Sequence, residues 1–136
     1  MPIMPSESRH LSETIERSAA DVYEFVSDPA NIPRWAQGLS TAVENVNGRW
    51  LLGTGSDRAS VAFAERNAFG VVDHEVKLPS GEIVHVPMRV VPNGDGCDVV
   101  LTVRRQPDMT DADFDRDSGL VKADLTRLKR VLEGTD

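Results

Sequence analysis

The sequence contains one cysteine, few aromatic residues and no long hydrophobic run. Cys97 alone cannot form an internal disulfide or a cysteine-based zinc site, which favours a reducing environment. The first ten residues lack the basic start and apolar stretch of an export signal, and no later segment approaches membrane-spanning length. We therefore expect a cytoplasmic protein without membrane insertion.

Positive charge is also scarce, with 15 Lys and Arg against 22 Asp and Glu, a net charge of −7. Binding to phosphate backbones or anionic membranes depends on clustered basic side chains, so we expect no nucleic-acid partner. The length of 136 residues and a 40% hydrophobic content suit one globular domain. We expect a single domain over residues 1–136, with about residues 1–7 as a flexible N-terminus.

Recognisable catalytic and cofactor motifs are missing. The sequence has no phosphate loop, no Gly-x-Gly-x-x-Gly, no His-Glu-x-x-His and no Gly-x-Ser-x-Gly. The Gly-Thr-Gly-Ser stretch at residues 53–56 opens no predicted helix, so it does not indicate a phosphate site. No cofactor is expected.

Two short helices are predicted near the N-terminus. Ser18 is suited to cap the first helix, which the Asp28-Pro29 pair ends because the residue before proline avoids the helical region. Asn31 is then expected to cap a second short helix that carries Trp35 and stops at Gly38.

The rest of the chain up to residue 105 has the pattern of an antiparallel meander. A first strand is predicted over residues 9–16, where apolar residues alternate loosely with polar ones. From residue 40, five turn signals separate six further strands, and Asn47-Gly48 is the strongest because this dipeptide favours a type I′ turn. This makes seven strands in all.

One long helix is predicted from about Thr110 to Glu133. Thr110 and Asp113 resemble a capping box, and acidic residues crowd the first turns while basic residues follow. An apolar stripe is formed by Phe114, Val121, Leu125, Leu128 and Leu132. Gly119 is unfavourable inside a helix, so we expect it to relieve crowding against the sheet or to bend the helix.

This order resembles the helix-grip superfamily, which includes START lipid-transfer domains, the birch-pollen allergen and polyketide cyclase/dehydrases. The resemblance covers nearly the whole chain and is carried by Ile15 to Pro29 with Trp35, by the segment from Phe69 to Gly81, and by the run from Pro87 to Gly96. The chain is similar to small actinobacterial-type SRPBCC members labelled polyketide cyclase/dehydrase. The resemblance implies an α+β helix-grip fold, a seven-stranded antiparallel sheet in β-α-α-β6-α order wrapped around the C-terminal helix. It also implies a cavity for an apolar ligand, and no shared catalytic residue.

Strand register predicts which side chains face the core. A four-residue loop at residues 93–96 would pair Val90 with Val99, Met88 with Leu101, and Val86 with Val103, all apolar. The same alternation places four polar residues on apolar faces. These four candidate pocket residues are Glu13, Glu65, His74 and Arg105.

Glu65 and His74 form the one candidate acid/base pair, because burial can tune the pKa values of both groups toward neutral pH. The structural alternative is that each lies at a strand end or pairs with a nearby arginine, and we favour it. No metal site is expected, because Asp73 and His74 are neighbours on a strand and point to opposite faces.

Trp35 has two interpretations: its indole covers a ligand at one mouth of the cavity, or it fixes the second short helix to the core. Met88 and Leu125 are expected in the core whether or not a cavity exists. The full set of predicted ligand-binding residues is Trp35, Phe63, Glu65, His74, Met88, Leu101, Val121 and Leu125.

Three functions remain open from the sequence. The first is binding of a small hydrophobic or amphipathic molecule, including a lipid, between the sheet and the C-terminal helix. The second is a polyketide cyclase or dehydratase reaction that uses Glu65 and His74. The third, a protein-interaction module, is disfavoured because the outward strand positions are polar. The expected partner is a small apolar or amphipathic molecule, and a homodimer is left as an open alternative.

Overall fold

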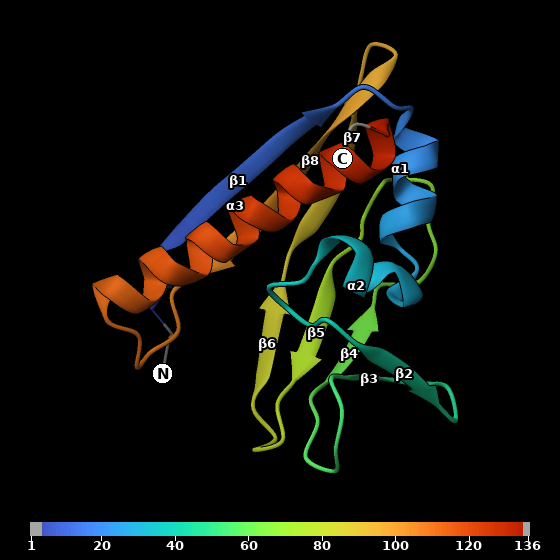
Figure 1. Cartoon of the computed structure of the whole chain (residues 1–136). Helices are drawn as coiled ribbons and strands as arrows, with labels where there is room; N and C mark the ends of the chain where they lie inside the picture. The colour runs from blue at the N-terminus through green and yellow to red at the C-terminus, as the bar shows by residue number, and fades with distance from the viewer. Residues whose placement is uncertain (1–3, 135–136) are drawn as a thin grey trace.

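The computed structural model describes residues 4–134, which form an α+β fold with antiparallel sheets and a long C-terminal helix (Figure 1). The strands of this part of the chain are β1 Ser8–Ile15, β2 Val43–Val46, β3 Arg49–Leu52, β4 Ser60–Phe63, β5 His74–Lys77, β6 Ile83–Val86, β7 Met88–Asn93 and β8 Gly96–Arg104. The helices are α1 Ala19–Val26, the 3-10 helix η1 Pro29–Asn31, α2 Ile32–Trp35 and α3 Asp111–Glu133.

The caps of α1 and η1 set the start of each helix. The Ser18 hydroxyl accepts a 3.1 Å hydrogen bond from the Asp21 backbone N–H, which confirms the predicted cap of α1. The prediction that Asn31 caps the next helix is wrong. Asp28 accepts from the backbone N–H of Ala30 at the start of η1, and the Asn31 side chain instead donates to the Phe25 carbonyl.

Helix α3 begins as the sequence predicts. Thr110 and Asp113 form a reciprocal capping box with two 3.1 Å hydrogen bonds. Gly119 does not relieve crowding, because a Cβ atom added there would meet no atom within 4 Å. That part of the prediction is wrong.

The strands form two antiparallel sheets in the orders β1-β8-β7 and β2-β3-β4-β5-β6. The structure has eight strands in residues 4–134 where the sequence predicted seven. The predicted sixth strand is divided at Pro87 into β6 and β7, because proline lacks the N–H that a continuous ladder requires. The predicted type I′ turn is present, with positive φ at Asn47 and Gly48.

The predicted register holds where β7 pairs with β8. Val90 lies opposite Val99, and Met88 lies opposite Leu101. The predicted pairing of Val86 with Val103 is absent from the ladders. The chain changes sheets at Pro87, so Val86 pairs with His74 of β5 instead.

Helix α3 runs along β1 and the three-stranded sheet, and α2 lies beside α3 above the five-stranded sheet (Figure 1). The core combines side chains from both sheets and the helices; its fully buried members include Ile15, Val22, Val26, Met88, Val99, Phe114, Leu125 and Leu128. No helix in residues 4–134 is long and apolar enough to cross a membrane.

The expected flexible N-terminus covers residues 1–7, of which residues 1–3 lie outside the described residues. Glu7 contacts the end of β8 on both main chain and side chain. Its carbonyl accepts a 2.9 Å hydrogen bond from the Arg105 backbone, and its carboxylate lies 3.4 Å from the Arg105 guanidinium.

Candidate functional site

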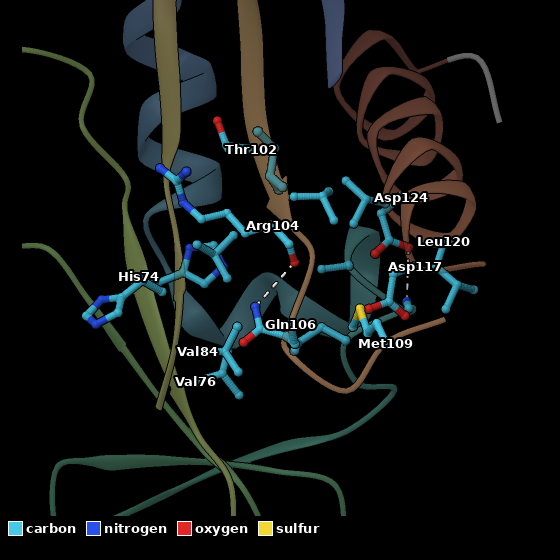
Figure 2. A pocket seen from close by; sticks show the side chains of 18 of the residues that line it. His74, Val76, Val84, Thr102, Arg104, Gln106, Met109, Asp117, Leu120 and Asp124 are labelled. Atoms are coloured by element: carbon cyan, nitrogen blue, oxygen red, sulfur yellow. Dashed lines mark hydrogen bonds between the residues drawn. The ribbon is translucent and has the colours of Figure 1, made fainter. Parts of the chain in front are cut away.

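A cavity of about 530 Å³ lies between α3, α2, β8 and the inner face of β5 and β6 (Figure 2). This volume falls in the range of small-molecule sites. Most of its wall is apolar; the apolar lining side chains include Val76, Leu78, Val84, Val86, Leu101, Val103, Met109, Leu120 and Val121. The chain passes from one sheet to the other at Pro87, and the five-stranded sheet extends away from α3 (Figure 1). The cavity is lined by residues of both sheets and of α3.

His74 is the buried imidazole of the cavity wall, with 7% of its surface exposed. Its Nδ1 lies 3.1 Å from the Val72 carbonyl oxygen, which can only accept, so this nitrogen carries the ring proton. Burial lowers the pKa of His74, opposed by the hydrogen bond to Val72 and by the charge of Asp73. The ring is therefore neutral near pH 7 and leaves Nε2 as a hydrogen-bond acceptor.

The His74 ring is also held from outside the cavity. Phe63, opposite His74 in the β4–β5 ladder, stacks on the imidazole with ring centroids 4.7 Å apart. Asp73, next to His74 in the chain, stabilises the start of β7 after Pro87. Its carboxylate accepts hydrogen bonds from the Met88 backbone N–H and from the Arg89 guanidinium. Those bonds lower the pKa of Asp73 against the opposing effect of burial.

Asp124 is the buried carboxylate of the cavity wall, also 7% exposed. Its Oδ1 accepts from the Gly38 backbone N–H at 3.0 Å and from the Arg127 guanidinium at 2.9 Å. Burial raises the pKa of Asp124, although both hydrogen bonds and the arginine charge oppose that rise. No protein donor in residues 4–134 reaches its Oδ2.

Further polar groups line the cavity, among them Asp117, Gln106 and Trp35. The Asp117 carboxylate, two turns before Asp124 on α3, has no hydrogen-bond partner within residues 4–134. The Gln106 amide nitrogen donates to the Arg104 carbonyl, which leaves its oxygen as an acceptor (Figure 2). The Trp35 Nε1 donor is buried without a partner in the described part of the chain.

The structure brings together four of the eight predicted ligand-binding residues in the main cavity: Trp35, His74, Leu101 and Val121. Phe63 lies behind His74 and lines a second hollow of about 420 Å³, which His74 also borders. Met88 and Leu125 are fully buried in the core and do not line the main cavity.

Glu65 is not brought to His74. It lies in the exposed segment after β4 and lines neither of these hollows. Two other predicted polar pocket residues also lie elsewhere. Arg105 forms a 2.6 Å ion pair with Asp111, and Glu13 lies on β1, opposite Val99 of β8. Neither borders the main cavity, so His74 is the one of the four that does.

Sequence reasoning missed Asp117, Asp124 and the loop from Gln106 to Met109. Asp117 is one of the acidic residues in the first turns of the long helix, which the sequence analysis explains by the helix dipole alone. The signal was present, because residues 117, 121 and 124 repeat at helical spacing and therefore share a face with part of the apolar stripe.

The family model for polyketide cyclase / dehydrase and lipid transport matches residues 8–133. The chain belongs to this family. A search of the curated proteins finds no match. The cavity of this polyketide cyclase/dehydrase family member therefore lies in a fold that the family uses for small-molecule binding or cyclase-like chemistry.

Solved structures share the helix-grip fold of this family member. DynU16, from the dynemicin biosynthetic locus, matches with a TM-score of 0.66 and 13% identity over 95% of this chain and 48% of its own. The chain thus spans about half the length of DynU16. Ara h 8.0201 matches with a TM-score of 0.64 and 13% identity, covering 94% of this chain and 98% of its own. The Aha1 dimer from Colwellia psychrerythraea matches with a TM-score of 0.71 and 12% identity, covering 96% of this chain and 98% of its own. At these identities the likeness concerns the fold alone.

Proposed function

We propose that this protein binds a small hydrophobic or amphipathic molecule in the cavity between α3 and the inner face of β5 and β6. The observation that carries the proposal is the cavity itself, about 530 Å³ with a mostly apolar wall and a few polar groups. Membership in a family described as polyketide cyclase, dehydrase and lipid transport supports the same class of ligand.

The packing around the cavity also supports binding. The side chains that form its floor, such as Val76 and Leu101, belong to strands held by the hydrophobic core, so the walls are pre-formed. An apolar molecule that enters releases water from these walls and gains about 25 cal/mol for each Å² of apolar surface that it buries.

Catalysis is not part of the proposal. The cyclase or dehydratase alternative relied on Glu65 and His74 as a pair, and Glu65 lies outside the cavity that His74 lines. A buried neutral imidazole alone is suited to positioning a ligand through a hydrogen bond.

Filling the cavity tests the proposal. Val84 lines the cavity and pairs with Val76, so Val84→Trp places an indole in the binding space. Titration with the neutral, environment-sensitive dye Nile red should give saturable binding to the natural protein and at least tenfold weaker binding to V84W. The matched control is Val46→Trp, on the exposed strand β2. Equal dye binding by V84W and V46W contradicts the proposal.

A further inference from the structure

We propose that the cavity selects a neutral apolar molecule that carries a hydroxyl group, and that this hydroxyl donates a hydrogen bond to Nε2 of His74. The inference rests on the proposed function and names the polar group that the ligand must carry. It is carried by a nine-tenths buried imidazole on the cavity wall whose second nitrogen atom is unused.

The hydrogen bond at Nδ1 determines what Nε2 of His74 can do. Nδ1 lies 3.1 Å from the Val72 carbonyl oxygen, and a carbonyl only accepts, so the ring proton is on Nδ1. A neutral imidazole has one ring proton, which leaves a lone pair on Nε2. Burial lowers the pKa of His74 and so favours this neutral form. Nε2 is therefore an acceptor and cannot donate.

Nε2 is also open to a ligand. It has no hydrogen-bond partner within residues 4–134. It is not sealed from solvent either, since Trp35 Nε1 and Arg58 Nε are the sealed side-chain atoms without a partner in these residues. The 7% of His74 that stays exposed thus includes Nε2. Because buried polar side chains nearly always have a partner, this lone pair marks a place where a bound molecule supplies the donor.

The imidazole faces the main cavity from the inner face of β5. His74 and Val76 are buried and line the cavity (Figure 2), whereas Glu75 and Lys77 of the same strand are exposed. Side chains stand roughly perpendicular to a sheet, and Nε2 lies at the end of the imidazole that is far from the backbone. It is therefore directed away from β5, into the space that Val76 also borders.

Neighbouring groups fix the imidazole before a ligand arrives. Phe63 stacks on it with ring centroids 4.7 Å apart and an angle of 24° between the planes. The Val72 backbone that holds Nδ1 is itself tied to β7, because its N–H donates a 2.9 Å hydrogen bond to the Met88 carbonyl. An acceptor that is already held in one orientation loses little entropy when a donor binds to it.

The apolar surroundings of His74 decide which kind of donor fits. Val86 lies opposite His74 in the β5–β6 ladder, and Val76 lies two residues along β5. An ammonium group in such surroundings would lose its hydration without gaining an ionised partner at the neutral ring. A carbonyl, ether or carboxylate oxygen cannot donate and would set its lone pairs against that of Nε2. A neutral hydroxyl supplies the donor without either cost.

Two probes with one apolar body test the assignment: 2-naphthol, which carries a hydroxyl donor, and 2-methoxynaphthalene, which carries an acceptor only. Displacement of Nile red at pH 7 gives their dissociation constants for the natural protein and for His74→Phe, which keeps a ring beside Phe63. In H74F the ratio of the two constants should shift against 2-naphthol by about 3-fold to 10-fold, the effect of one hydrogen bond between neutral groups. Each ratio is taken within one protein, so a general change in the cavity cancels.

The matched control is His10→Phe, because His10 is exposed on β1 and borders neither hollow. H10F should keep the ratio of the natural protein. Nitrogen-15 NMR of the imidazole gives a second readout in the natural protein, without any substitution. There, 2-naphthol should shift the Nε2 signal of His74, and 2-methoxynaphthalene should leave it near its position in the free protein.

The outcomes distinguish this inference from the proposed function. An unchanged ratio in H74F, an equal shift of the ratio in H10F, or an Nε2 signal that 2-naphthol does not move overturns the hydroxyl assignment and leaves cavity binding intact. Binding of Nile red that 2-naphthol cannot displace does the same. Absence of Nile red binding to the natural protein overturns the proposed function itself.

Discussion

The backbone N–H of Gly38 donates a 3.0 Å hydrogen bond to Oδ1 of Asp124, which joins the segment after α2 to the middle of α3. Residue 38 also has no room for a side chain next to α3. A Cβ atom at residue 38 would lie 2.9 Å from Asp124 Oδ2 and 3.2 Å from Leu120 Cβ. The φ angle of Gly38 is not positive, so the close approach, and not backbone strain, requires glycine at this position.

Gly38→Ala should therefore destabilise the protein. The added methyl group must displace Asp124 from Gly38 or push α2 away from α3, at a cost of about 1 to 3 kcal/mol in the free energy of unfolding. Urea unfolding followed by circular dichroism measures this difference. An unchanged midpoint would show that the contact between Gly38 and Asp124 is loose.

Gly119→Ala should have the opposite effect. Gly119 lies inside α3 in open space, and alanine favours the helix by about 0.8 to 1 kcal/mol relative to glycine. The same unfolding experiment should show a higher midpoint without a change in the denaturant slope. Destabilisation would mean that α3 needs a flexible or bent position at this residue.

His74 should make stability depend on pH. Its pKa lies below the ordinary value of about 6.5 in the folded protein, because burial disfavours the charged ring. The unfolded chain therefore binds more protons below pH 6.5, so the free energy of unfolding is highest above that pH and falls as the pH decreases through 6.5 toward 5.

The test is His74→Phe, which keeps an aromatic ring beside Phe63 and removes the titrating group. Unfolding in urea at a series of pH values from 7.5 to 5 should show a smaller decrease in stability for the variant than for the natural protein. Parallel curves would contradict a neutral, buried His74.

Two leucines of α3 should respond differently to truncation. Leu125 is fully buried in the core, so Leu125→Ala should lower the free energy of unfolding by about 2 to 5 kcal/mol. Leu120 is about half exposed at the cavity, so Leu120→Ala should cost less than about 1 kcal/mol. Thermal unfolding of the two variants compares them, and similar losses would contradict the assignment of Leu125 to the core and Leu120 to the cavity wall.

Local sequence signals predicted most of the fold. Ser18, the Asn47-Gly48 turn and the Thr110–Asp113 capping box act through neighbours in the chain, so their effects follow from short-range geometry alone. The apolar pairs of β7 and β8 followed from the length of one turn. The division of a strand at Pro87 was missed because it depends on where the chain leaves one sheet for the other.

The candidate site was less predictable. Strand parity identified His74, because alternation alone determines which face it occupies. The same reasoning gave the wrong position for Glu65. Strand β4 ends at Phe63, and the alternation of side chains between the two faces does not continue beyond the end of a strand. Asp124 required knowledge that Gly38, 86 residues away in the chain, approaches the same turn of α3.

The most direct test of cavity binding is methyl-resolved NMR of the protein titrated with 2-(naphthalen-1-yl)ethanol, a neutral amphipathic probe. The account predicts that saturating probe shifts the methyl signals of Val76, Val84, Leu101 and Val121, which line the cavity, and leaves those of the exposed Val46 and Val91 unchanged. Shifts confined to the exposed valines, or no shift at any cavity methyl group, would contradict it.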